Sequence, residues 1–283
     1  MTLASNAAQD IDGVSLLDRL SAADAMANQA AYSDEAIVQN YARTADLKAP
    51  ERAILDLVGH RLATMRMLDI GVGGGRTTLH FATRVREYVG IDYVADMIEA
   101  CRRRFPETQP GVSFDVCDAR DLARFADESF DFVLFSFNGI DTVPHDDRLT
   151  ILREVSRVGR RGGLFCFSAH NLQFMETLCF GRVFSNYRTV PKNLRRWFRL
   201  RFIWNSLGRL NRLRQASYAV INDGLHGGRV RQYYIRPLAQ IEQLTPRFGG
   251  VRVFRSTDGV EIAGDLELTK TEEPWVYYLC SIL

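Results

Sequence analysis

Hydrophobic and polar positions alternate along the chain in the manner of an α/β protein. Five short apolar runs are expected to form strands, and the segments between them have the spacing of amphipathic helices. Strands that alternate with helices predict a parallel sheet covered by helices on both faces. The predicted strands span residues 67–70, 88–91, 112–116, 132–135 and 164–167, and the predicted helices span residues 76–85, 95–105 and 148–158, the last ended by residues 160–163.

Three alternating glycines follow the first predicted strand. In LDIGVGGGRTT, Gly71, Gly73 and Gly75 come after Asp69. Glycine permits a tight turn and lets a ligand approach the backbone, and ligands of such sheets bind beyond the carboxyl ends of the strands. A nicotinamide dinucleotide site would place its third glycine at Arg76. The glycines alone are also compatible with a plain strand-to-helix turn.

Acidic residues follow the next two strands. Asp92 lies 21 positions beyond Gly71, a distance at which an acid accepts hydrogen bonds from ribose hydroxyls. Asp118 follows the third strand beside Cys117, at the place where an adenine ring would lie. A single acid such as Asp118 is more often a solvated loop residue or a helix cap. Together with the glycines and Asp92, it is predicted to be a ligand.

These motifs resemble those of class I S-adenosylmethionine (SAM)-dependent methyltransferases of the small-molecule type. The similar stretches are LDIGVGGGRTT, YVGIDYVADMIEACRRRFP, VSFDVCDARDL, ESFDFVLFSFNGID and LREVSRVGRRGGLFCFSAHN, all within residues 67–171. The resemblance implies a Rossmann-like α/β fold with a seven-stranded, mainly parallel sheet and helices on both faces. It also implies an antiparallel last pair of strands, for which residues 251–254 and 275–279 are candidates.

The resemblance implies SAM as the cofactor and assigns residues to it. Gly71, Gly73 and Gly75 would pass under its methionine part and ribose, while Asp69 would fix the turn or meet its ammonium group. Asp92 would hold the ribose hydroxyls, and Asp118 the adenine amine. The other predicted cofactor contacts are Tyr41, Tyr93, Met97, Cys117, Ala119, Phe137 and Asn138.

Several acceptor classes can be argued against. The fourth strand is followed by SFNGID rather than by the Asn/Asp-Pro-Pro-aromatic motif of nucleic-acid amine methyltransferases, and the chain has no Pro-Cys dipeptide of the cytosine-C5 enzymes. A lysine-rich tail is absent as well, so no nucleic acid is expected as a partner. A small-molecule or lipid-linked acceptor is left as the main class, methylated on oxygen or nitrogen. The scattered cysteines form no CxxC pair, and no metal is expected.

Candidate catalytic groups follow the fourth and fifth strands. His170 is the first candidate for a base, because imidazole titrates near neutral pH, although it could equally hydrogen-bond its own loop. His145 and Asp141 come next, and His145 is more often simply the start of a solvated helix. Predicted substrate contacts are Asn171 and, in a helical N-terminal cap, Tyr32, for which ordinary packing is an equal alternative.

The chain is predicted to have three parts. Residues 1–65 form the helical cap, residues 66–171 and 232–283 the SAM-binding core, and residues 172–231 a helical, basic insertion. From Arg182 to Arg231 there are twelve Lys and Arg and one acid, a net charge of +11, which leaves −9 for the rest of a chain of net +2. The insertion is either a solvated lid, a pocket for a phosphate- or carboxylate-bearing substrate that uses Arg195, Arg196 and Arg199, or a segment that lies on an anionic membrane.

Two functional classes stay open. The first is an active methyltransferase, and the second is a SAM-binding protein of the same fold that acts as a non-methylating enzyme or a binding module. The expected location is cytoplasmic, either free or at the membrane surface, because no secretory signal, no apolar run long enough to span a membrane and no disulfide framework is seen. The sequence makes no prediction of the oligomeric state.

Overall fold

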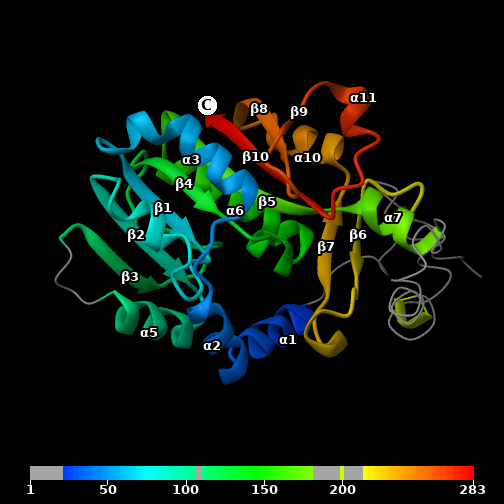
Figure 1. Ribbon diagram of the computed structural model, residues 1–283, viewed down its shortest axis with the longest axis horizontal. Helices are drawn as coiled ribbons and strands as arrows, with labels where there is room; N and C mark the ends of the chain where they lie inside the picture. The colour runs from blue at the N-terminus through cyan, green and yellow to red at the C-terminus, as the bar shows by residue number, and fades with distance from the viewer. Residues whose placement is uncertain (1–21, 106–109, 181–197, 201–212) are drawn as a thin grey trace, which may run out of the picture.

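A ten-stranded sheet forms the centre of the molecule (Figure 1). The computed structural model describes residues 22–105, 110–180, 198–200 and 213–283. Within them the strand order is β3-β2-β1-β4-β5-β10-β8-β9, and β7 pairs with both β5 and β6. The strands are β1 (Arg66–Ile70), β2 (Glu87–Asp92), β3 (Val112–Val116), β4 (Phe130–Phe135), β5 (Gly159–Asn171), β6 (Tyr218–Ile221), β7 (Gln232–Ile235), β8 (Phe248–Arg255), β9 (Glu261–Ile262) and β10 (Trp275–Ile282).

The predicted fold class is confirmed. Strands β3, β2, β1, β4 and β5 are parallel neighbours, and β10 runs antiparallel to both β5 and β8. Seven of the strands are those predicted. The other three, β6, β7 and β9, are short strands that the apolar pattern did not indicate, and β6 lies inside the segment predicted to be a helical insertion.

Helices cover both faces of the sheet. They are α1 (Ala22–Tyr32), α2 (Glu35–Arg43), α3 (Ala49–Leu62), α4 (Thr78–Phe81), α5 (Ala95–Arg104), α6 (His145–Val158), α7 (Leu172–Phe180), α10 (Pro237–Leu244) and α11 (Asp265–Leu268), with short 3-10 helices η2 (Gly139–Thr142) and η4 (Leu225–Gly228). None of the described helices combines the length and apolar character that a bilayer crossing needs.

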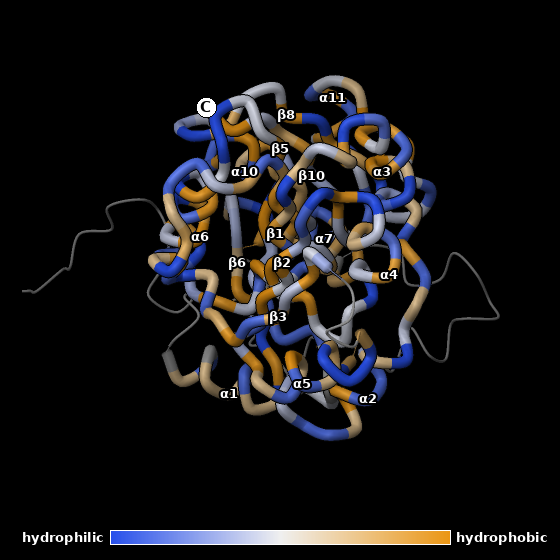
Figure 2. Tube along the Cα trace, turned by 90° about the vertical axis from the view of Figure 1, so that its left-hand side faces the viewer, coloured by the Kyte–Doolittle hydropathy of each residue, from blue (hydrophilic) through white to orange (hydrophobic). Residues whose placement is uncertain are grey.

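Alternate residues of the central strands enter two separate cores. Val133 and Phe135 of β4 pack with α6 on one face, whereas Phe132 and Leu134 pack with α3 and α5 on the other. Figure 2 shows hydrophobic segments gathered towards the middle of the molecule, along the strands. This alternation explains why the buried strands read as continuous apolar runs in the sequence.

Three predicted boundaries are corrected. Helix α4 covers only residues 78–81 of the predicted 76–85, because the preceding residues remain in the turn after β1. Residues 160–163 belong to β5 rather than to a helix end, and β5 pairs with β4 from Gly159 onward, across a shift in register. Helix α3 packs on the sheet, so within residues 22–65, the described part of the predicted cap, α1 and α2 are the helices that cover the ends of the strands.

Candidate cofactor and acceptor site

A cavity of about 460 Å³ lies at the carboxyl ends of β1, β2 and β4, beneath α1 and α2. This volume is in the range of small-molecule sites. Predicted cofactor and substrate residues from separate parts of the chain meet in its wall, namely Tyr32, Tyr41, Gly71, Asp92, Tyr93, Met97, Cys117, Asp118, Ala119 and Phe137. The sheet topology explains this gathering, because residues that directly follow parallel strands all lie at one edge.

Gly71 and Asp92 form the floor of the cavity. Gly71 has a φ of +63°, and a Cβ atom there would lie 3.0 Å from the Phe135 ring, so only glycine suits this turn. The Asp92 carboxylate accepts hydrogen bonds from the backbone N–H groups of Gly73 (3.0 Å) and Val94 (2.9 Å). Burial raises the pKa of Asp92 to about 6 despite these two donors. An ionised Asp92 therefore gains from any further donor that enters the cavity.

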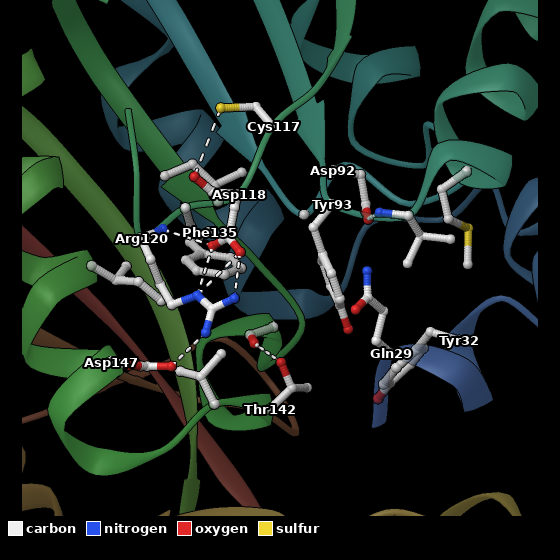
Figure 3. Close-up of a pocket in the computed structure, with 18 of the residues that line it drawn as sticks. Gln29, Tyr32, Asp92, Tyr93, Cys117, Asp118, Arg120, Phe135, Thr142 and Asp147 are labelled. Carbon is white, nitrogen blue, oxygen red and sulfur yellow. Dashed lines mark hydrogen bonds and ion pairs between the residues drawn. The ribbon is translucent and has the colours of Figure 1, made fainter. Parts of the chain in front are cut away.

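An ion-pair bridge closes another side of the cavity (Figure 3). The Arg120 guanidinium donates to both Asp118 oxygens and, at 2.6 Å, to Asp147 near the start of α6. Burial alone would raise the pKa of Asp118, but the hydrogen bonds from Arg120 hold it below its usual value. Asp118 is thus an ionised acceptor at the cavity wall. Arg120 and Asp147 were not predicted as site residues, because the fold alone brings them together.

Tyrosines from the N-terminal helices form the opposite wall. Tyr32 ends α1 and meets Tyr41 of α2 edge to face, with 6.3 Å between ring centroids. Burial raises the pKa of both phenols, and the nearby Asp92 raises that of Tyr41 further. Both side chains are therefore neutral hydrogen-bonding groups over the cavity.

Three residues of the glycine motif serve the turn rather than the cavity surface. Asp69 is buried and accepts hydrogen bonds from the hydroxyls of Thr77 and Tyr88, so of its two predicted roles it has that of fixing the turn. Gly73 binds Asp92 through its N–H, and a Cβ at Gly75 would clash with Phe105 at 2.4 Å. Neither glycine lines the described cavity wall.

His170 lies beside the cavity in a chain of hydrogen bonds. Its Nδ1 and its backbone N–H both bind Asp141 Oδ2, at 2.9 and 2.7 Å, and its Nε2 lies 3.2 Å from Asn138 Nδ2. Asn138 is flanked by Phe137 and Gly139, which line the cavity. Phe137 and Asn138 both have positive φ values, of 57° and 62°. Two adjacent strained residues of this kind are typical of functional sites.

Two further predicted site residues, Asn171 and His145, are not among the described residues that line the cavity. Asn171 is fully buried. Its amide donates to the carbonyls of Thr271 and Glu273, and its Oδ1 accepts from the N–H of Gln173. These bonds occupy its side chain, which corrects its prediction as a substrate contact. His145, predicted as a catalytic candidate, begins α6, and its Nδ1 lies 2.7 Å from the Tyr233 hydroxyl.

The basic insertion is only partly described. Arg195 and Arg196 lie outside the described residues, whereas Arg199 is described and exposed. Two other cations of the insertion face acids of the N-terminal helical region: Arg229 lies 3.6 Å from Asp34, and Arg231 lies 3.5 Å from Asp24. Some of the positive charges of the insertion thus form ion pairs with the cap.

A buried network beside the cavity was missed in the sequence. Glu51 of α3 accepts from Arg76, Ser136 and the Tyr277 hydroxyl, and Ser136 lines the cavity. Arg76, the residue directly after the glycine motif, is thereby bound to α3. No spacing rule links these four positions, because they come from four distant segments.

The methyltransferase domain family matches residues 67–163. This part of the chain is thus similar to methyltransferase domains. The chain is 38% identical over 105 residues to the fatty-acid O-methyltransferase of Mycolicibacterium smegmatis, a match that covers 36% of each protein. It is 31% identical over 146 residues to the mitochondrial ubiquinone biosynthesis O-methyltransferase of Homo sapiens, covering 49% of this chain and 38% of the relative. The chain therefore spans less than half the length of these curated relatives.

Solved methyltransferases share the fold over most of the chain. The 1,6-didemethyltoxoflavin-N1-methyltransferase of Burkholderia thailandensis, with bound S-adenosylhomocysteine, is 16% identical and covers 93% of this chain and 91% of its own, with a TM-score of 0.57. A SAM-dependent methyltransferase of Mesorhizobium loti is 18% identical, covers 83% and 97%, and has a TM-score of 0.54.

The cavity has the chemistry that SAM, the cofactor of this family, requires. The glycine turn leaves the backbone at Gly71 open, and the Asp92 and Asp118 carboxylates offer acceptors for hydroxyl and amine donors. Neutral aromatic rings from Tyr41 and Phe137 suit a positively charged sulfonium. The residues present therefore fit the cofactor.

Proposed function

We propose that this protein binds SAM in the cavity and methylates an oxygen or nitrogen of a small-molecule or lipid-linked metabolite. The observation that carries the proposal is the joint presence of the open turn at Gly71 and the carboxylates of Asp92 and Asp118 in one cavity wall. When bound, SAM supplies a methyl group already activated on a sulfonium, so the protein must align the acceptor and receive its proton.

In this proposal Asp92 and Asp118 orient the cofactor. Asp92 accepts from the ribose hydroxyls, and Asp118, kept ionised by Arg120, accepts from the adenine amine. Tyr32, Tyr41 and Phe137 exclude water above the reacting groups. Proximity and orientation of this kind supply up to about 7–11 kcal/mol of a barrier.

His170 is the base in this proposal. Asp141 Oδ2 can only accept, so its contact with Nδ1 places a proton on that atom and leaves Nε2 to take the proton of the acceptor. His170 is 14% exposed, beside the Asn138 turn that flanks the cavity. A base placed in this way contributes about 10²–10⁴-fold to a rate.

An oxygen acceptor on a lipophilic molecule is the variant that the relatives favour. Both curated relatives cited above are O-methyltransferases by name, one for fatty acids and one of ubiquinone biosynthesis. A fatty acid also bears a carboxylate, which agrees with the proposed role of Arg199, with Arg195 and Arg196 of the same segment, in binding an anionic substrate. The second candidate is a SAM-binding protein that transfers no methyl group. It is favoured by the position of Asn138 Nδ2, which lies 3.2 Å from His170 Nε2 and occupies the atom that would take the proton.

Methyl-labelled SAM with a panel of fatty acids, hydroxylated aromatics and amines tests the proposal. Label should enter one class in the wild-type protein. His170→Ala should lower turnover by about 10²-fold or more while the dissociation constant for SAM hardly changes. His60→Ala, on the exposed side of α3, is the matched control.

Wild-type turnover in His170→Ala would assign the histidine a structural role. Calorimetric SAM binding with no label transferred to any acceptor, including a metabolite extract, would favour the non-methylating alternative.

A further inference from the structure

A fully buried guanidinium lies behind the His170–Asp141 pair. Arg148, in the first turn of α6, is 0% exposed. It donates to Asp141 Oδ1, to the carbonyl of Ile140 at 3.1 Å and to the side chains of Gln240 and Gln243. A charge with so little access to water is costly unless it is paired, so this arrangement is more specific than a surface ion pair.

The two oxygens of Asp141 have separate partners. Oδ1 accepts from Arg148, whereas Oδ2 accepts from the backbone N–H and Nδ1 of His170. Asp141 is itself 0% exposed. The carboxylate therefore joins the guanidinium and the imidazole in a row.

This row has an electrostatic consequence. A lone buried carboxylate beside an imidazole favours the imidazolium form, which cannot act as a base. Here the charge of Asp141 is already balanced by Arg148. Asp141 can then orient the ring and fix its Nδ1 proton without strongly favouring protonation of Nε2.

We infer that Arg148 is a positioning residue that balances the charge of Asp141 and so holds His170 correctly oriented at the acceptor side of the cavity. The inference rests on the proposed role of His170 as the base. The other polar and titratable groups near the ring are Asn138 and, from β7, the Tyr234 ring at 4.8 Å between centroids, whose hydroxyl donates to Asp223.

The titration of His170, followed by NMR of histidine-labelled protein, tests this inference without a substrate. The chain has five histidines, and His170→Gln assigns the signal. Arg148→Met should raise the titration midpoint of His170 by about one pH unit or more, because Asp141 is then uncompensated. Arg148→Lys keeps the charge and should leave the midpoint within a few tenths of a unit of the wild-type value.

Asp141→Asn is the second variant and has the opposite expected sign. It leaves Arg148 uncompensated, so the His170 midpoint should fall. It tests whether Asp141 acts on His170; if Arg148→Met does not fold, as judged by thermal unfolding, Arg148→Gln takes its place, with the same expected rise. A His170 midpoint that stays at the wild-type value in a folded variant without the Arg148 charge would overturn the role of Arg148.

The role of Arg148 and the role of His170 as the base are tested by different measurements, so either can be contradicted without the other. The midpoints report the charges around His170 whether or not methyl transfer occurs. Loss of turnover in His170→Ala reports the base whether or not Arg148 controls it.

Discussion

In the proposed function, the Asp92 carboxyl should make SAM binding dependent on pH. Its pKa is raised to about 6 by burial, and donors in a bound cofactor would favour the ionised form. A ligand that prefers the ionised form lowers this pKa, so affinity should be full above pH 6 and fall by up to about tenfold per pH unit below it. Calorimetry between pH 5 and 8 measures this dependence.

Asp69 is the internal control for the pH effect. Its pKa is also raised to about 6 by burial, but it faces Thr77 and Tyr88 rather than the cavity. Asp92→Asn should bind weakly with a flat pH profile, whereas a folded Asp69→Asn should retain the acid-side decline. A decline that survives in Asp92→Asn would assign the titration to another group.

At the scale of single residues, the sequence predicted positions that directly follow strands. Gly71, Asp92 and Asp118 meet in one wall because parallel strands end at one edge. Asn171 is likewise at the carboxyl end of a strand, yet backbone carbonyls of residues 271 and 273 accept hydrogen bonds from its amide. Such long-range partners leave no spacing pattern, so a polar residue that caps a helix and one that binds a substrate look alike in the sequence.

At the scale of elements, the side chain of one asparagine, Asn28, holds α1 in place beside the cavity through hydrogen bonds. Asn28 is 1% exposed; its Nδ2 donates to the carbonyls of Thr142 and Arg231, and its Oδ1 accepts from the Arg231 N–H. It therefore joins α1 to η2 and to the residue before β7. The positions of Gln29 and Tyr32 in the cavity wall depend on this attachment.

Asn28→Ala should lower the free energy of unfolding by about 1–3 kcal/mol, the cost of leaving buried backbone groups unpaired, and should weaken SAM binding as α1 detaches. Denaturant unfolding and calorimetry measure the two effects. Asn40→Ala, on the exposed side of α2, should change neither. An Asn28→Ala variant with wild-type stability and affinity would rule out α1 as a fixed cover.

The sequence predicted the long apolar strands well and the short ones poorly. Strands β1, β2 and β4 and the middle of β5 are buried on both faces, and each gives a clear apolar run, whereas β3 lies at the sheet edge with Phe114 buried. Strands β6 and β7 are only four residues long: β6 reads YAVI but lies in the segment predicted to be a helical insertion, and β7 reads QYYI, with a polar start at Gln232. Their pairing depends on the end of β5, at His170 and Asn171, which is a tertiary contact.

At the scale of the whole molecule, charge is divided between the core and the insertion. Some described cations of the insertion face acids of the cap, as Arg231 faces Asp24. In the proposed function, an anionic acceptor or an anionic membrane would be bound through the arginines of the segment around Arg199.

Neutralising Arg195, Arg196 and Arg199 together should raise the KM of the acceptor or abolish sedimentation with anionic vesicles, with SAM affinity unchanged. Contact with a vesicle should fade between low and moderate salt, because screening shortens the range of surface charge to about 10 Å at 0.1 M. Replacing exposed Arg43, Arg61 and Arg84 is the control for net charge alone. Wild-type KM in the triple variant, with no vesicle binding by the wild-type protein, would leave the insertion as a solvated lid.

Calorimetric titration with S-adenosylhomocysteine tests the central claim, that the cavity is the cofactor site, most directly. The wild-type protein should bind one equivalent, and Asp92→Ala should lose roughly 1–3 kcal/mol of binding free energy with the loss of hydrogen bonds to a charged group. Asp127→Ala, an exposed acid far from the cavity wall, should bind as the wild-type protein does. Equal affinity in a folded Asp92→Ala, or no binding by the wild-type protein, would contradict the account.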